Sequence, residues 1–182
     1  MVDPAWLRLR AVACAAANAG GRAALARFHD RERLAVESKS DESPVTIADR
    51  EAEDACQATI MAAYPDDAWL GEESGGRGET GAVGTRRWIV DPIDGTRAYL
   101  SGHPDWSIAI ALLVEGRPVL GLVYAPAHDL LYEAAAGTGA LRNGAPIATS
   151  DHATLRGARV AGPKPLIDRL DRAAGATERL ER

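Results

Sequence analysis

The sequence predicts an α+β protein in which two helices precede a largely antiparallel sheet. Residues 7–28 and 44–64 are rich in alanine, with apolar side chains at helical spacing. From residue 68 onward, short apolar runs alternate with turn residues, as is typical of strands. Connections of only a few residues join the later runs. Because a parallel crossover needs about a dozen residues or more, these runs are expected to be antiparallel neighbours.

The first helix is expected at residues 7–28, where alanine predominates. Gly20 and Gly21 are expected to interrupt it softly. In the polar stretch that follows, residues 34–39 alternate apolar and polar side chains only weakly. This segment is therefore either a short strand or an extended loop.

The second helix is expected to open at Pro44, because proline is favoured in the first turn of a helix. Ser43 or Thr46 would supply the N-terminal cap. The apolar positions continue as far as Tyr64, and Pro65 is expected to stop the helix.

Two short strands are expected at residues 68–71 and 87–90, each bounded by turn residues. Residues 75–81 between them are rich in glycine but lack the Lys-Ser/Thr ending of a phosphate-binding loop. We therefore interpret them as a surface loop. A short helix is expected at residues 94–100.

Three further strands are expected at residues 106–114, 118–124 and 130–135, forming a meander. The character of the sequence changes after residue 150. We therefore expect an N-terminal α+β domain at residues 1–150 and the start of an incomplete C-terminal subdomain at residues 151–182. Within the second part we expect a short strand, the start of a helix, and an exposed helix or frayed tail at residues 159–161, 165–170 and 172–182.

The composition limits the partners of the protein. The chain has 182 residues, a formal net charge of −5 and a pI near 5.4, which argues against a surface for nucleic-acid polymers. No stretch reaches the roughly 18 to 20 apolar residues that span a membrane. Cys14 and Cys56 lie in alanine-rich segments and are expected to be reduced thiols, which favours a cytoplasmic location.

The run Asp91-Pro92-Ile93-Asp94 follows an apolar strand, so that both carboxylates can face one cleft. Two close carboxylates repel each other unless a proton or cation lies between them, and hard oxygen ligands favour Mg²⁺. The Ile93 carbonyl is a further candidate ligand.

Gly95 and Thr96 open the helix that follows, and their backbone N–H groups are candidates for binding a phosphate oxygen. A simpler interpretation remains open. An isolated Asp-Gly pair is a common turn signal, and Asp94 alone could serve only as a helix cap.

Two other acidic segments could contribute to the same site. Glu72 ends the strand at residues 68–71, and a neighbouring strand that ends at Asp91 would bring a third carboxylate beside the first two, enough for two or three metal ions. Asp49 lies one turn into the second helix. Its alternative role is to interact with the first turn of that helix.

These segments, in this order and spacing, resemble the inositol monophosphatase family of lithium-sensitive, Mg²⁺-dependent phosphatases. The resemblance depends mainly on Trp-Ile-Val-Asp-Pro-Ile-Asp-Gly-Thr, and also on Gly-Glu-Glu-Ser and Lys-x-Asp-x-Ser-Pro-Val-Thr-x-Ala-Asp. It covers roughly residues 5–165. It implies a layered helix and sheet sandwich, a small phosphorylated metabolite as substrate, and inhibition by Li⁺. It is also compatible with a homodimer.

The resemblance also implies roles for individual residues. Glu72, Asp91 and the Ile93 carbonyl would bind the first Mg²⁺, and Asp91 and Asp94 would reach the second. A metal-activated water would attack phosphorus in line. The remaining roles are water activation by the Asp49 and Thr96 pair together with Glu72, phosphate binding by Asp94, Gly95 and Thr96, and contact of Lys39 with an outer metal or its waters.

The sequence departs from its relatives after Ser150. Family members carry a late Trp-Asp segment whose Asp completes the second metal site, and neither Asp168 nor Asp171 lies in such a setting. The chain is therefore expected to be truncated, with a weaker second metal site. Its substrate would be a 3′(2′),5′-bisphosphate nucleotide, ranked slightly before inositol monophosphate and histidinol phosphate. The alternative is a non-catalytic remnant that binds Mg²⁺ or a partner.

Overall fold

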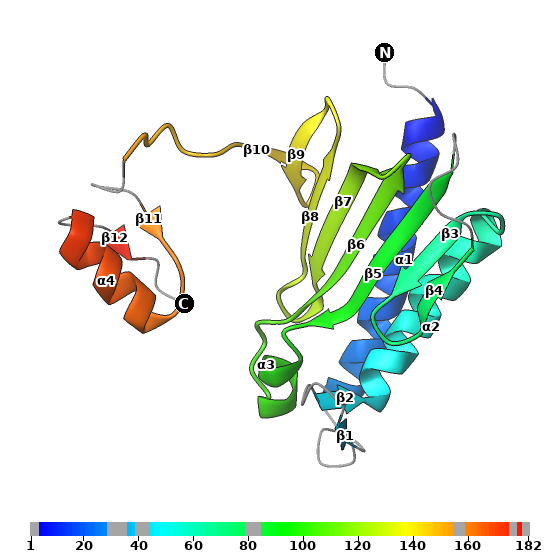
Figure 1. Ribbon diagram of the computed structural model, residues 1–182, viewed down its shortest axis with the longest axis horizontal. Helices are drawn as coiled ribbons and strands as arrows, with labels where there is room; N and C mark the ends of the chain where they lie inside the picture. The colour runs from blue at the N-terminus through cyan, green and yellow to red at the C-terminus, as the bar shows by residue number, and fades with distance from the viewer. Residues whose placement is uncertain are drawn as a thin grey trace. The chain divides into compact units, whose positions relative to one another are not determined.

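The computed structural model describes residues 4–28, 36–38, 44–78, 85–154, 159–174 and 178–179 (Figure 1). The chain divides into two units, Met1–Ile147 and Ala148–Arg182, which are described separately. The first unit contains helices packed on a mixed, mostly antiparallel sheet, which confirms the expected α+β class.

The sheet of the first unit has the strand order β10-β9-β8-β7-β6-β5-β3-β4. All neighbouring strands in it are antiparallel except β3 and β5, which are parallel. The meander expected after residue 106 is therefore confirmed. The strands are β3 (Ala68–Gly71), β4 (Gly75–Arg77), β5 (Arg86–Asp94), β6 (Ser107–Val114), β7 (Arg117–Ala125), β8 (Leu130–Ala135), β9 (Gly139–Arg142) and β10 (Ala145–Ile147).

Two long helices, α1 (Pro4–Phe28) and α2 (Ile47–Ala63), lie side by side against one face of this sheet (Figure 1). The core between the helices and the sheet contains alanines from the helices and large side chains from the strands, such as Trp88 and Leu112. Small side chains let the two helices approach closely, and the large side chains of the strands fill the core volume. Two short helices, α3 (Thr96–Ser101) and the 3₁₀ turn η2 (Pro126–His128), complete the unit.

Helix α1 runs without a break through Gly20 and Gly21, so the expected interruption is wrong. The glycines are instead required for packing. A Cβ on Gly20 would lie 2.5 Å from the Sγ of Cys56 on α2, and one on Gly21 would lie 2.7 Å from the ring of Tyr124. Both distances are shorter than van der Waals contact allows.

Two other local expectations were also wrong. Residues 44–46 do not open a helix but form β2 (Pro44–Thr46), which pairs antiparallel with β1 (Val36–Ser38), so α2 begins only at Ile47. The start of the glycine-rich segment at residue 75 is strand β4, because it pairs along β3. Ser43 and residues 79–84 lie outside the described residues.

The second unit contains helix α4 (Lys164–Ala174) and two short strands, β11 (Arg159–Val160) and β12 (Glu178–Arg179), which pair in parallel. The short strand expected at residues 159–161 is confirmed, whereas a strand replaces the helix or tail expected at residues 178–179. No helix in the described parts of the chain is both long and apolar enough to cross a membrane.

Candidate metal and phosphate site

The parallel pairing of β3 with β5 brings two carboxylates to one edge of the sheet. Gly71 is the register partner of Val90, and the backbone N–H of Glu72 donates to the Val90 carbonyl at 3.1 Å. Because parallel strands end at the same edge, Glu72 and Asp91 follow these partners side by side. The close approach of these carboxylates, expected from the sequence, is therefore present.

A buried aspartate just before β3 fixes the alignment of the two strands at their other end. Asp67 is 9% exposed and accepts a hydrogen bond from Trp88 Nε1 at 2.8 Å and another from Arg86 Nε at 2.9 Å. A slip of either strand would break both bonds. Asp67 therefore helps to keep Glu72 beside Asp91.

Asp91 is half-buried and poorly compensated. Its Oδ1 is buried and has no hydrogen-bond partner. Burial, repulsion from Glu72, a hydrogen bond shared with Glu72 and repulsion from Asp94 together raise the pKa of Asp91 to about 7. A carboxyl group in this setting gains from a cation or a proton placed next to it. We call Glu72, Asp91 and Asp94 the Asp91 cluster.

The turn from β5 into α3 has a backbone that only glycine adopts without strain. Gly95 lies in the left-handed region at φ 93° and ψ 33°. A Cβ at this position would also lie 2.9 Å from the carbonyl oxygen of Asp105. The Thr96 hydroxyl donates to the Ile93 carbonyl at 3.0 Å, which leaves that carbonyl a second lone pair for another partner.

The short helix α3 is tied to the helical layer by Tyr99. The buried Tyr99 hydroxyl donates to the carbonyl of Ala24 on α1 at 2.6 Å. Its ring packs against Phe28 and Trp106, with centroid distances of 5.2 and 5.0 Å. These contacts hold the segment that carries Thr96 against α1.

Helix α2 carries two buried acidic side chains. Asp49 and Glu53 lie one turn apart, and each is 2% exposed. Glu53 accepts hydrogen bonds from the backbone N–H groups of Glu73 and Ser74, each at 2.8 Å. The sequence reasoning missed Glu53, although its spacing of four residues from Asp49 on a helix was a usable signal.

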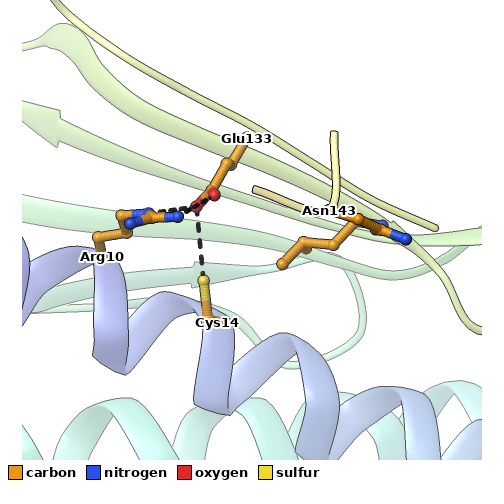
Figure 2. A network of polar contacts seen from close by, with 5 residues as sticks. Arg10, Cys14, Glu133 and Asn143 are labelled. Atoms are coloured by element: carbon orange, nitrogen blue, oxygen red, sulfur yellow. Dashed lines mark hydrogen bonds and ion pairs between the residues drawn. The ribbon is translucent and has the colours of Figure 1, made fainter. Parts of the chain in front are cut away.

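The buried carboxylate of Glu133 on β8 has surroundings unlike those of Asp91 (Figure 2). Arg10 of α1 binds both of its oxygens, with a distance of 2.6 Å between Arg10 Nε and Glu133 Oε2, and the Cys14 thiol lies 3.6 Å from the same oxygen. Hydrogen bonding to Arg10 lowers the pKa of Glu133, while burial and Glu133 raise the pKa of Cys14 to about 11. We call Arg10, Cys14 and Glu133 the Glu133 cluster.

The Asp91 cluster contains carboxylates that fit a metal ion. No group of three or more His, Cys, Asp or Glu side chains within the described residues is arranged to hold a metal ion as it stands. The pair of Glu72 and Asp91 nevertheless fits one, because the two carboxylates are in contact and the buried Asp91 Oδ1 has no partner. All available donors are oxygens, which suits Mg²⁺ or Ca²⁺.

The expected contacts of the other candidate residues with the site remain predictions. Thr96 donates to the Ile93 carbonyl, and its expected pairing with Asp49 stays a prediction. Lys39 lies outside the described residues. Asp168, in the second unit, is paired with Lys164 at 2.7 Å. Cys14 and Cys56 are both free thiols, as expected.

Similarity to a known protein family extends over nearly the whole chain. The model of the inositol monophosphatase family matches residues 6–178. The chain belongs to this family. Its segment of similarity therefore includes both units and the whole Asp91 cluster.

Members of the family with known names are similar to large parts of the chain. A histidinol-phosphatase of Chlorobaculum parvum is 46% identical over 123 residues, which are 68% of this chain and 46% of that protein. The 3′(2′),5′-bisphosphate nucleotidase CysQ of Escherichia coli is 36% identical over 124 residues, which are 68% of this chain and 50% of that protein. The chain thus spans about half the length of these relatives.

A solved structure gives the same result for the fold. The extragenic suppressor protein suhB of Bartonella henselae superimposes with a TM-score of 0.81 at 29% identity, over 94% of this chain and 70% of that one. An inositol monophosphatase from Anabaena superimposes with a TM-score of 0.75 at 28% identity, over 96% of this chain and 67% of that one. The layered arrangement of helices and sheet is therefore that of the inositol monophosphatase family.

Proposed function

We propose that the protein takes part in the Mg²⁺-dependent hydrolysis of a small phosphate monoester and that the Asp91 cluster is its metal site. The observation that carries the proposal is the buried, unpartnered Asp91 Oδ1 beside the like-charged Glu72 at the ends of two parallel strands. A structural carboxylate is normally neutralised by a partner, as Glu133 is by Arg10. The names of the relatives, both phosphatases, support the same reaction class.

The proposed chemistry assigns the residues of the site the roles that the family resemblance implies. Glu72, Asp91 and the Ile93 carbonyl would hold one Mg²⁺, and Asp91 with Asp94 would hold a second. When bound, Mg²⁺ lowers the pKa of a coordinated water and neutralises charge on the phosphate. The backbone N–H groups of Gly95 and Thr96 would orient the phosphate oxygens.

Asp49 and Thr96 would act on the attacking water. The Thr96 hydroxyl would accept a hydrogen bond from that water while donating one itself, to the Ile93 carbonyl as in this structure or to Asp49. Asp49, which is 2% exposed, would receive the proton of that water. Glu72 would help to orient the same water.

The substrate is narrowed to two leading classes. The sequence ranks a 3′(2′),5′-bisphosphate nucleotide slightly first, and the nucleotidase CysQ supports that class. The higher identity to a histidinol-phosphatase supports histidinol phosphate. Both compounds share a phosphate monoester on a small polar alcohol, and inositol 1-phosphate belongs to the same chemical class.

The test measures phosphate release by the purified chain with Mg²⁺ from adenosine 3′,5′-bisphosphate, histidinol phosphate and inositol 1-phosphate. We expect Mg²⁺-dependent release from at least one of them, and its loss in Asp91→Asn. Glu51→Gln is a matched control. Glu51 lies on α2, the helix that carries Asp49, and forms an exposed ion pair with Arg27 of α1. Release from none of the three would refute the enzymatic proposal and favour the non-catalytic alternative.

A further inference from the structure

We propose that Glu53 is a positioning residue for the metal site: its carboxylate fixes the turn that carries Glu72. This inference rests on the proposed function, in which Glu72 is a ligand of the metal ion. Glu53 lies on α2, outside the Asp91 cluster. Its side chain is directed at the turn between β3 and β4, where both of its oxygens accept backbone hydrogen bonds.

The two hydrogen bonds hold the residues that follow Glu72. Oε2 of Glu53 accepts from the Glu73 N–H and Oε1 accepts from the Ser74 N–H, each at 2.8 Å. On the other side of Glu72, its own N–H donates to the Val90 carbonyl at 3.1 Å. The backbone of Glu72 is therefore fixed from β5 on one side and from α2 on the other.

The glycine before Glu72 is required for this arrangement. A Cβ on Gly71 would lie 2.2 to 2.7 Å from the three carboxylate atoms of Glu53. Gly71 has no positive φ that would demand glycine. The absent side chain is thus explained by the close approach of the Glu53 carboxylate to the strand.

Burying the Glu53 carboxylate costs free energy, which argues against a purely structural role. A carboxylate that is 2% exposed has lost nearly all of its hydration, and the Glu53 carboxylate accepts hydrogen bonds from two backbone N–H groups. Water or a neutral side chain could accept hydrogen bonds from the backbone N–H groups of this turn without the burial of a charge. Charge-assisted hydrogen bonds are stronger and more directional than neutral ones, which suits a group that must hold a ligand in place.

The experiment compares Mg²⁺ and Ca²⁺ binding to the full chain by titration calorimetry. Mg²⁺ demands near-ideal octahedral geometry, whereas Ca²⁺ accepts irregular sites. We expect Glu53→Gln to weaken Mg²⁺ binding by about 10-fold or more, as is usual when an outer-shell partner of a ligand is lost. The Ca²⁺ affinity should fall much less. An equal fall for both ions would indicate only the loss of a negative charge and would overturn the proposal.

A double-mutant cycle separates position from charge. Gly71→Ala keeps the Glu53 charge but displaces its carboxylate, so it should weaken Mg²⁺ binding selectively, as Glu53→Gln does. In a Glu53→Ala background the added methyl group has space, and Gly71→Ala should then have little further effect. Additive effects of the two substitutions would contradict the proposal.

Two controls keep the outcome interpretable. Glu51→Gln removes an exposed ion pair from the same helix and should leave Mg²⁺ affinity unchanged. Melting temperatures in EDTA show whether each variant folds.

Amide hydrogen exchange gives a readout that does not require metal binding. Exchange of the Glu73 and Ser74 amides should be faster in Glu53→Gln than in the parent, and unchanged exchange would overturn the proposal.

The failure of this inference differs from the failure of the proposed function. A parent chain that binds Mg²⁺ but hydrolyses no substrate refutes the function alone. A parent that binds Mg²⁺ selectively, with unchanged selectivity in both Glu53→Gln and Gly71→Ala, refutes the role of Glu53 alone. A parent that binds no Mg²⁺ refutes both.

Discussion

The Asp91 cluster and the Glu133 cluster both hold carboxylates on the same sheet, yet their electrostatic environments are opposite. Glu133 is bound by Arg10 through both oxygens, and this contact lowers its pKa (Figure 2). Asp91 has a buried oxygen without a partner and carboxylates as neighbours, and its pKa is raised to about 7. The first arrangement stabilises the fold, whereas the second destabilises it unless a cation binds.

This difference supports the proposal that Asp91, rather than Glu133, belongs to a metal site. Burial alone does not separate the two, because both side chains lose water. The sign of the pKa shift does, since a group that contributes to folding has its charged form favoured and a group reserved for a ligand has it disfavoured. Substitutions in the two clusters should therefore have opposite consequences.

The largest expected effect is the loss of metal-dependent stabilisation in Asp91→Asn. At a Mg²⁺ concentration 100 times its dissociation constant, binding adds about 2.7 kcal/mol to the free energy of unfolding. The variant should lose this gain, yet in EDTA at pH 7 it should be at least as stable as the parent, because one repelling charge is removed. Thermal unfolding with and without Mg²⁺ measures both quantities. An unchanged melting shift on adding Mg²⁺ would remove Asp91 from the site.

The next effect is the destabilisation caused by Arg10→Ala. It leaves the buried Glu133 carboxylate without its main partner, which costs about 1 to 3 kcal/mol. The Mg²⁺-dependent melting shift should remain. Arg27→Ala, which breaks the exposed pair with Glu51, is the control and should cost at most about 0.5 kcal/mol. Equal costs for the two arginines would show that the Glu133 cluster is no more important than a surface ion pair.

The last difference is in pH dependence, measured by urea unfolding in EDTA. The folded chain keeps the Asp91 proton up to about pH 7, whereas the unfolded chain releases it near the usual aspartate pKa of about 3.9, so this group lowers stability as the pH rises between them. Glu133 has the opposite sign: it stabilises above the usual glutamate pKa of about 4.3, and that contribution is lost as the pH falls through its lowered folded pKa.

Single substitutions separate these two contributions. Asp91→Asn should remove the decline between about pH 4 and 7, and Glu133→Gln should reduce the loss of stability in acid. A decline above pH 4 that persists in Asp91→Asn would assign it to other groups.

The sequence predicted the Asp91 cluster better than the Glu133 cluster because its members lie in local signals. Asp91 and Asp94 directly follow an apolar strand, and Glu72 follows another. Only the adjacency of those strands had to be assumed, and the structure shows that they are neighbours and pair in parallel. Glu133, by contrast, is one polar residue in a short apolar strand. Its meaning depends on Arg10, more than a hundred residues away.

The remaining errors have the same origin. Gly20 looks like a helix interruption until its distance from Cys56 is known, and Pro44 looks like a helix start until the pairing of β2 with β1 is known. Both depend on contacts between segments that local propensity does not describe. Glu53 was missed for a related reason, because its partners are backbone groups of a turn on another element.

The most direct test of the account is the position of a bound ion in crystals of the full chain soaked with Mn²⁺, an octahedral substitute for Mg²⁺ that is visible by anomalous scattering. We predict an anomalous peak at the Asp91 cluster, within coordination distance of the Asp91 and Glu72 carboxylates. The Glu133 cluster should carry no peak. An ion at Glu133, or a fully occupied Mn²⁺ elsewhere with none beside Asp91, would contradict the assignment of the two clusters.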